Sequence, residues 1–138
     1  MNFKIFLLAP ALLLMNNCKT QTSQADTSVA SANTIRINLE KQAKIPNSQV
    51  NLKFRDITED SRCPVDVTCV WEGIAIVNIE ATSGSQTNSF QVGTRDFSAK
   101  NVSKSFSFSG YKFTLVELKP QPGGKAEAAS LTLKYEKE

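Results

Sequence analysis

Apolar and polar residues alternate along much of the chain beyond residue 33. A period of two is typical of a strand with one buried face. The alternation is clearest in residues 35–39, 50–54 and 131–135. Between Val70 and Ala81 the apolar residues fall on both faces instead, and we expect a central strand there that is covered on two sides.

A hairpin is predicted near the C-terminus, where residues 106–108 and 111–115 alternate on either side of the turn dipeptide Ser109-Gly110. A two-residue loop places Phe106 opposite Phe113 on one face, so the turn and the pattern agree on the register. The alternation shifts by one residue after position 115, which predicts a bulge there. The prolines that begin at position 120 end the strand, because proline cannot donate to the ladder.

These patterns predict an all-β fold of about seven short antiparallel strands. No stretch predicts a helix of ten residues, and segments 42–48 and 96–102 are predicted to be loops. Ser83-Gly84-Ser85 predicts a turn, and Phe90 with Val92 predicts a shorter strand after it. We expect a single β-sandwich of immunoglobulin-like type, with a small β-barrel as the alternative.

Residues 1–17 have the features of a lipoprotein signal peptide, because Lys4 precedes an apolar run that is too short to span a bilayer as a helix. The run leads to Asn17-Cys18, and Cys18 is the expected lipidation site. Asn17 departs from the small residue usual before a lipidated cysteine. The alternative is an ordinary secretory signal, cleaved elsewhere, that leaves Cys18 as a free thiol.

Residues 18–33 are predicted to be the lipidated cysteine and a flexible tether, because small polar residues cannot bury enough apolar area to become ordered. Such a tether spans roughly 20 Å. Residues 34–138 then form the β-sandwich domain. These features predict a membrane-anchored lipoprotein of the bacterial cell envelope, at the outer membrane and on its periplasmic or surface face.

Charge and composition exclude several classes of function. The chain has 16 basic and 13 acidic residues and no basic stripe with interleaved aromatics, so no nucleic-acid partner is expected. It has no histidine, and its carboxylates, serines and lysines form no readable catalytic pair. We therefore expect neither an enzyme nor a cofactor.

Cys63 and Cys69 are expected to form a disulfide in the oxidising envelope. A redox pair is disfavoured because the spacing is C-x5-C and no histidine lies nearby to lower a thiol pKa. A zinc or copper site would need further soft ligands. Closing so short a ring stabilises the fold by roughly 2 kcal/mol on the chain-entropy account.

The segment around this disulfide holds the candidate partner-binding residues, which are Asp60, Arg62, Trp71 and Glu72. Trp71, the only tryptophan, either packs inward on the disulfide or points outward as an anchor for a partner. The core position is favoured. Gly73 is expected to mark a bulge or a close backbone approach.

Acidic residues gather in the same segment. A calcium ion takes six or more oxygen ligands, but the spacing matches no known calcium loop. Arginines lie among the carboxylates, so ion pairs and turn capping are the favoured interpretation and no metal ligand is assigned. The acidic residues are Asp56, Glu59, Asp60, Asp66 and Glu72.

The run Asp60-Ser61-Arg62-Cys63-Pro64, followed by Cys69-x-Trp71-x-Gly73, resembles a segment of small uncharacterised bacterial envelope lipoproteins. In that group the segment precedes a β-rich half with a strand similar to residues 111–115 that runs into prolines. The resemblance implies the β-rich fold and the envelope location, and it implies no mechanism.

The function expected from the sequence is non-enzymatic binding of an envelope protein, peptide or glycan through the loop from Asp60 to Gly73. A disulfide in such a loop lowers the ordering cost of binding. The alternatives are a calcium-binding module and a structural or assembly accessory of an envelope complex.

Overall fold

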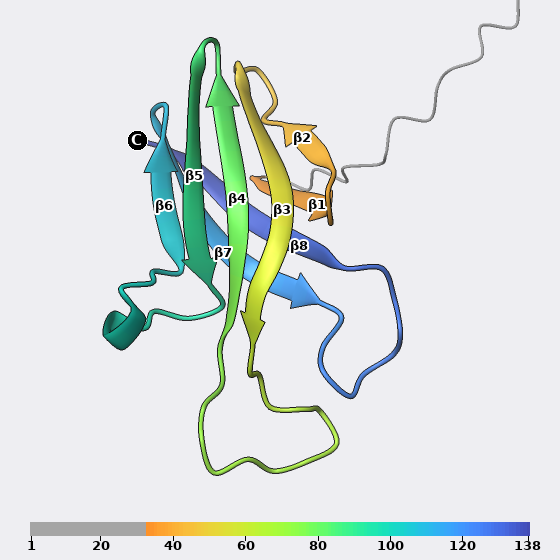
Figure 1. The fold of residues 1–138 in the computed structure, drawn as a ribbon. Coiled ribbons are helices and arrows are strands. Elements are labelled where there is room, and N and C mark those ends of the chain that lie inside the picture. Colours follow the sequence, from red (N-terminus) through yellow and green to blue (C-terminus); the bar gives the residue numbers. More distant parts are fainter. Residues whose placement is uncertain (1–32) are drawn as a thin grey trace, which may run out of the picture.

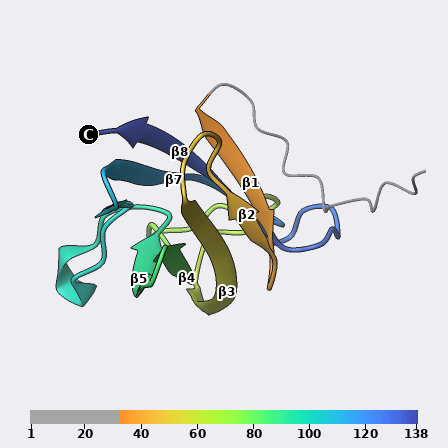
Figure 2. The ribbon, with the colours of Figure 1, turned by 90° about the horizontal axis from the view of Figure 1, so that it is seen from above.

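Two antiparallel sheets of four strands each lie face to face in the computed structural model, which describes residues 33–138 (Figures 1 and 2). One sheet has the strand order β1-β8-β7-β6 and the other β2-β3-β4-β5. The two sheets do not close into a barrel, so the predicted β-sandwich is confirmed and the barrel alternative is wrong. The strands are β1 (Thr34–Asn38), β2 (Gln42–Lys44), β3 (Val50–Asp60), β4 (Ala75–Ser83), β5 (Gln86–Gly93), β6 (Ser105–Phe108), β7 (Tyr111–Lys119) and β8 (Ser130–Lys137).

The core lies between the sheets and is built from the alternating residues that the sequence indicated. On β3, Leu52 and Phe54 are fully buried, and Leu131 and Leu133 of β8, in the other sheet, belong to the same buried cluster. One side of the core is aromatic, and the Phe90 and Phe106 rings stack there with their centroids 4.5 Å apart. Burying apolar side chains of this size stabilises the fold by about 1.5–3 kcal/mol each.

The predicted C-terminal hairpin is confirmed in its register. Phe106 pairs with Phe113, and both turn residues, Ser109 and Gly110, have positive φ, as a tight two-residue turn requires. The expected bulge follows Leu115, where the register of β7 against β8 shifts by one residue.

Three predictions about particular segments need correction. Gln42–Lys44 is a strand rather than part of a loop, which makes eight strands, and its three residues are too few to show a period. The loop 96–102 contains a short 3-10 helix, Ser98–Lys100. The central strand begins only at Ala75, so Val70 and the residues up to position 74 lie in a loop.

The expected two-sided burial of β4 is present near its start. Val77 and Ile79 face the main core, whereas Ile74 and Ile76 pack with Val102 in a second, smaller cluster on the other face. The segment that follows β5 supplies that cover. The N-terminal end of β4, next to the long β3–β4 loop, is therefore packed on both faces.

The predicted signal peptide, the lipidation site Cys18 and all of the predicted tether except Asn33 lie outside the described residues. Among residues 33–138, no helix has the length and apolar character needed to cross a bilayer.

Candidate functional site

The longest connection within one sheet joins β3 to β4 and extends beyond the end of the sandwich (Figure 1). We call residues 61–74 the disulfide loop, because Cys63 and Cys69 form a disulfide within it, with their Cα atoms 5.9 Å apart. The predicted pairing is confirmed. The bond closes a seven-residue ring in the outer part of the loop.

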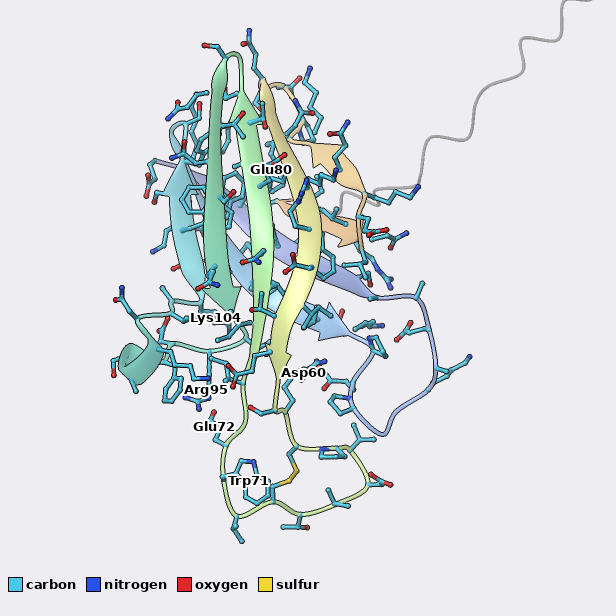
Figure 3. The ribbon with its side chains drawn as sticks, in the orientation of Figure 1. Asp60, Trp71, Glu72, Glu80, Arg95 and Lys104 are labelled. Carbon is cyan, nitrogen blue, oxygen red and sulfur yellow. A yellow bond between two sulfur atoms is a disulfide. The ribbon has the colours of Figure 1, made fainter. Side chains whose placement is uncertain are left out.

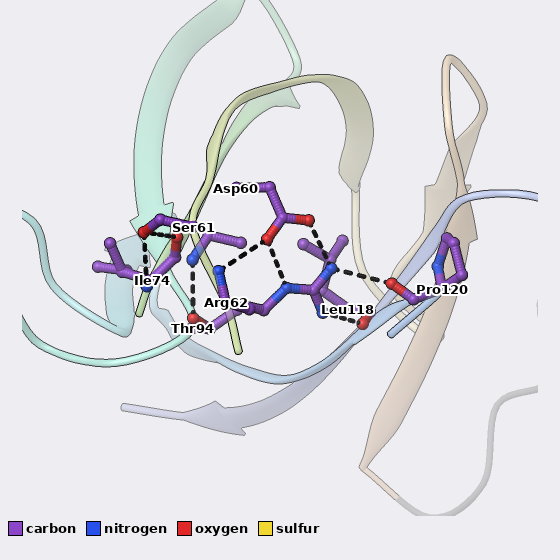
Figure 4. A network of polar contacts seen from close by, with 8 residues as sticks. Asp60, Ser61, Arg62, Ile74, Thr94, Leu118 and Pro120 are labelled. Carbon is purple, nitrogen blue, oxygen red and sulfur yellow. Dashed lines mark hydrogen bonds and ion pairs between the residues drawn. The ribbon is translucent and has the colours of Figure 1, made fainter. Parts of the chain in front are cut away.

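Arg62 connects the base of the loop to the other sheet (Figure 4). Its guanidinium makes a bidentate pair with Asp60, with Nε 2.8 Å from Oδ1 and Nη2 2.7 Å from Oδ2. It also donates to the carbonyl oxygens of Leu118 at 2.7 Å and Pro120 at 2.9 Å, at the end of β7. The Arg62 side chain is only 11% exposed, so this network is shielded from water. One arginine thus joins β3, the disulfide loop and β7.

Arg62 lowers the pKa of the Asp60 carboxyl group. Burial alone would raise its pKa, but hydrogen bonds from the Arg62 side chain and backbone, together with the Arg62 charge, outweigh burial and lower the pKa below its ordinary value. Asp60 therefore stays ionised at neutral pH. It also accepts the backbone N–H of Arg62 at 3.3 Å, which is the turn capping that the sequence suggested.

The two ends of the loop meet in a tight neck. The backbone N–H of Ser61 donates to Ile74 O at 2.8 Å, and the Ile74 N–H donates to the Ser61 hydroxyl oxygen at 3.1 Å (Figure 4). A Cβ atom at Gly73 would lie 1.8 Å from the carbonyl oxygen of Ser61. Gly73 is therefore at a close backbone approach, one of the two roles expected for it, and no larger residue fits without moving the backbone.

Arg95, which the sequence analysis did not single out, holds the other end of the loop. Its guanidinium donates to the carbonyl oxygens of Gly73 at 3.1 Å and Glu72 at 3.0 Å. It also lies over the Phe97 ring, 4.7 Å from the centroid. Arg95 is more than twenty residues from the loop in sequence, so no local pattern could have identified it.

The segment that carries Arg95 is ordered by its neighbour Asp96. The Asp96 carboxylate accepts the backbone N–H of Lys104 at 2.8 Å and the hydroxyl of Ser103 at 3.2 Å. The hydrogen bond from the Lys104 backbone, followed by that from Ser103, lowers the pKa of Asp96. These hydrogen bonds join Asp96 to residues 103 and 104 and so connect the two ends of the segment, beside the neck of the disulfide loop.

The outer part of the loop presents apolar side chains to solvent. We call Val65, Val67, Val70 and Trp71 the apolar tip; they are 62%, 53%, 96% and 63% exposed. Only two other large apolar side chains of the described residues are exposed, Leu39 and Val116. The favoured core position for Trp71 is wrong, because the strand that would have buried it starts only at Ala75. The loop lies beyond the end of the sheets, and Trp71 lies far out on it (Figure 3).

The acidic residues do not converge on one point. Within residues 33–138, no three acidic, cysteine or histidine side chains are grouped closely enough to hold a metal ion. Most of them have separate partners, as the ion-pair interpretation predicted. Asp56 accepts from Asn78, Glu59 pairs with Lys100, Asp60 pairs with Arg62, and Glu72 lies 3.9 Å from Arg95.

The four predicted partner-binding residues therefore divide into two groups. Asp60 and Arg62 lie at the base, where they fix the loop to the domain, whereas the side chains of Trp71 and Glu72 are exposed. The three valines of the tip were not among the predicted site residues. Val65 and Val67 alternate with Asp66 and Thr68 as in a strand, and nothing in that pattern indicated that no sheet would receive them.

A scan against family models, a search of curated proteins and a search of solved structures each found no match. The function is therefore inferred from the geometry of the disulfide loop.

Proposed function

We propose that this protein is a non-enzymatic binding module that engages a partner protein through the apolar tip of the disulfide loop. One observation carries the proposal: four of the six exposed large apolar side chains of residues 33–138 lie within seven consecutive positions. Scattered exposed apolar residues are ordinary, but four that lie so close together in sequence and include a tryptophan favour an interaction site.

The rigidity of the loop supports this function. The disulfide closes the outer ring, and Arg62 and Arg95 hold the two sides of the base through hydrogen bonds of 2.7–3.1 Å. A loop that is already ordered loses less conformational entropy when it binds. These restraints act on the backbone of the loop and at its base, whereas the side chains of the tip remain exposed.

The composition of the tip favours a protein or peptide over a glycan. Three of its four members are valines, whose side chains offer no hydrogen bonds to sugar hydroxyls. Apolar contact with a complementary protein surface would remove them from water, at about 25 cal/mol for each Å² of apolar area. Within the predicted envelope location, the partner would be another envelope protein with an apolar recess.

The test compares capture of envelope proteins by the tagged full chain with capture by Trp71→Ala and Val116→Ala. Val116 is the matched control, because it is 55% exposed and lies on β7, outside the loop. Any captured protein is identified, purified and titrated against all three chains. We expect Trp71→Ala to weaken the affinity at least tenfold, as loss of a hot-spot aromatic does, and Val116→Ala to change it less than twofold.

Each result bears on the proposal. Trp71→Ala should melt within a few degrees of the wild type, because an exposed side chain contributes little to the core. A purified partner whose affinity is equal for all three chains would place the contact elsewhere and overturn the proposal. Failure of the wild type to retain any partner would also count against it.

A further inference from the structure

One edge of the sandwich is an open strand. β5 is the edge of its sheet: it pairs with β4 on one side and is not hydrogen-bonded to β6, which belongs to the other sheet. At its C-terminal end, the N–H of Gly93 donates to Ser103 O at 3.0 Å, on the side away from β4. Backbone groups of alternate residues point to the same side of a strand. The N–H groups of Thr87 and Ser89 therefore also point away from β4, along the stretch 86–90 that segment 94–104 leaves uncovered (Figures 1 and 2).

This edge lacks the usual protection against strand pairing. Natural edges are shortened, bulged or given lysines and prolines, because a bare edge is a template for another strand. β5 has eight residues, Gln-Thr-Asn-Ser-Phe-Gln-Val-Gly, without charge or proline, and its register against β4 has no bulge. At the opposite side of the sandwich, β1 and β2 are five and three residues long and contain Arg36 and Lys44.

We propose that stretch 86–90 of β5 pairs antiparallel with the same stretch of a second copy of this chain, about a two-fold axis at Asn88. This interaction is separate from the proposed function of the disulfide loop. The axis is at the middle of the open stretch, so Asn88 faces its own counterpart, Thr87 faces Ser89 of the second copy and Gln86 faces Phe90. The two β2-β3-β4-β5 sheets thereby become one sheet of eight strands.

The second copy is favoured as the occupant because the stretch is complementary to itself. A charge on the axis, at position 88, would face a like charge of the second copy, whereas Thr–Ser and Asn–Asn pairs can hydrogen-bond. The second copy also presents a strand that is already ordered, whereas a free peptide must lose backbone entropy to form one. This symmetric arrangement is isologous and closes at a dimer.

The nearest charge on the neighbouring strand does not oppose the pairing. Glu80 of β4 lies opposite Ser89, and Arg55 is 3.8 Å from its carboxylate. In the dimer the two Glu80 residues are separated by three strand spacings, about 14 Å, which exceeds the screening length of about 8 Å at physiological salt. An interface of this kind is smaller than the roughly 1,200 Å² of stable complexes, so the dimer should be weak and should form at high micromolar concentration or on a crowded membrane.

Cysteine cross-linking of the full chain in detergent tests the contact and its register. Asn88→Cys places two thiols at the axis, where opposite Cα atoms are about 4.5 Å apart and within the range of a disulfide. Ser85→Cys is the control, because it is exposed on the same hairpin but is roughly 20 Å from its counterpart at about 3.4 Å per residue. We expect at least tenfold more cross-linked dimer from Asn88→Cys than from Ser85→Cys or from the wild type, which provides the background from the native cysteines.

Sedimentation velocity gives a second, thiol-free measurement. The wild type should show a mass that rises with concentration, Asn88→Lys should remain monomeric because two ammonium groups meet at the axis, and Ser85→Lys should behave as the wild type. Equal cross-linking of the two cysteine variants would overturn the proposal, as would concentration-dependent association that Asn88→Lys leaves unchanged. A cross-link from Asn88→Cys to a different protein, without homodimer, would replace the second copy by a foreign strand and would also overturn it.

Discussion

Replacing Arg62 by alanine removes the group that joins β3, the disulfide loop and β7. The side chain donates four hydrogen bonds, two to the Asp60 carboxylate and one each to the carbonyl oxygens of Leu118 and Pro120. All four are charge-assisted, since the donor is a guanidinium. The variant leaves the partly buried Asp60 charge without its counter-ion, so we expect a loss of stability well above that of a surface substitution.

The magnitude follows from the burial of the pair. Removing one member of a fully buried ion pair costs about 3–5 kcal/mol, whereas exposed pairs contribute about 0–1 kcal/mol. Arg62 is 11% and Asp60 29% exposed, so water can partly replace the lost donors around the carboxylate. We expect Arg62→Ala to lower the free energy of unfolding by about 2–4 kcal/mol, which corresponds to a fall in Tm of roughly 10–25 °C for a domain of this size.

Guanidinium denaturation followed by far-ultraviolet circular dichroism measures this loss on the whole sandwich, because the exposed Trp71 would report mainly on the loop. Arg55→Ala is the matched control: Arg55 is 49% exposed and its single ion pair, with Glu80, is 3.8 Å long. It should cost less than about 0.5 kcal/mol. Arg62→Lys should be intermediate, since a single ammonium cannot span Asp60 and both carbonyl oxygens. Equal stabilities for Arg62→Ala and Arg55→Ala would refute the anchoring role.

Four further outcomes are expected. Gly73→Ala should lower stability by more than about 2 kcal/mol in thermal melts, because its Cβ would overlap a carbonyl oxygen at 1.8 Å. Cys63→Ser should lower the free energy of unfolding by roughly 2 kcal/mol, because the disulfide closes a ring of seven residues, and it should make the loop sensitive to proteases. Asp60 and Asp96 have depressed pKa values in the folded state, so their stabilisation is complete above their unfolded pKa values of about 4 and is lost as the pH falls through the folded values. The difference in the free energy of unfolding between the wild type and Asp60→Asn should accordingly become smaller toward pH 2 in urea titrations. Millimolar calcium should leave the Tm unchanged, because no three carboxylates converge among the described residues.

Period-two alternation was sufficient to predict most of the sandwich. The hairpin of β6 and β7 shows why: the two-residue turn and the aromatic alternation specify the same register, and the pairing of Phe106 with Phe113 satisfies both. Strand β2 was missed because three residues cannot show a period, and only its pairing with β3 makes it a strand. The location of a strand in a sheet is a tertiary property that its own residues do not encode when they are so few.

The site was harder to predict than the fold, because it depends on contacts between distant segments. The apolar residues from Val70 to Ala81 predicted one central strand, yet the sheet receives only the part from Ala75 onward. Trp71 was expected in that strand, with packing inward on the disulfide as the favoured position, although the loop that carries it extends past the end of the sheets and leaves it exposed. Arg95 could not be predicted from the sequence of the loop, since the donor to the Gly73 carbonyl oxygen could come from any segment that the fold brings close to it.

The restraints that stabilise this loop lie apart from its proposed contact surface. Arg62, Gly73 and Arg95 act at its base, and no residue of the apolar tip is among the partners of either arginine. A variant that loosens the base without unfolding the domain, such as Arg95→Ala, should therefore weaken partner binding although Arg95 lies outside the proposed contact surface. Its effect should arise from the greater entropy lost on binding, whereas Trp71→Ala acts by removing contact area. The two variants should consequently differ in free-chain dynamics, with faster backbone hydrogen exchange in residues 61–74 for Arg95→Ala alone.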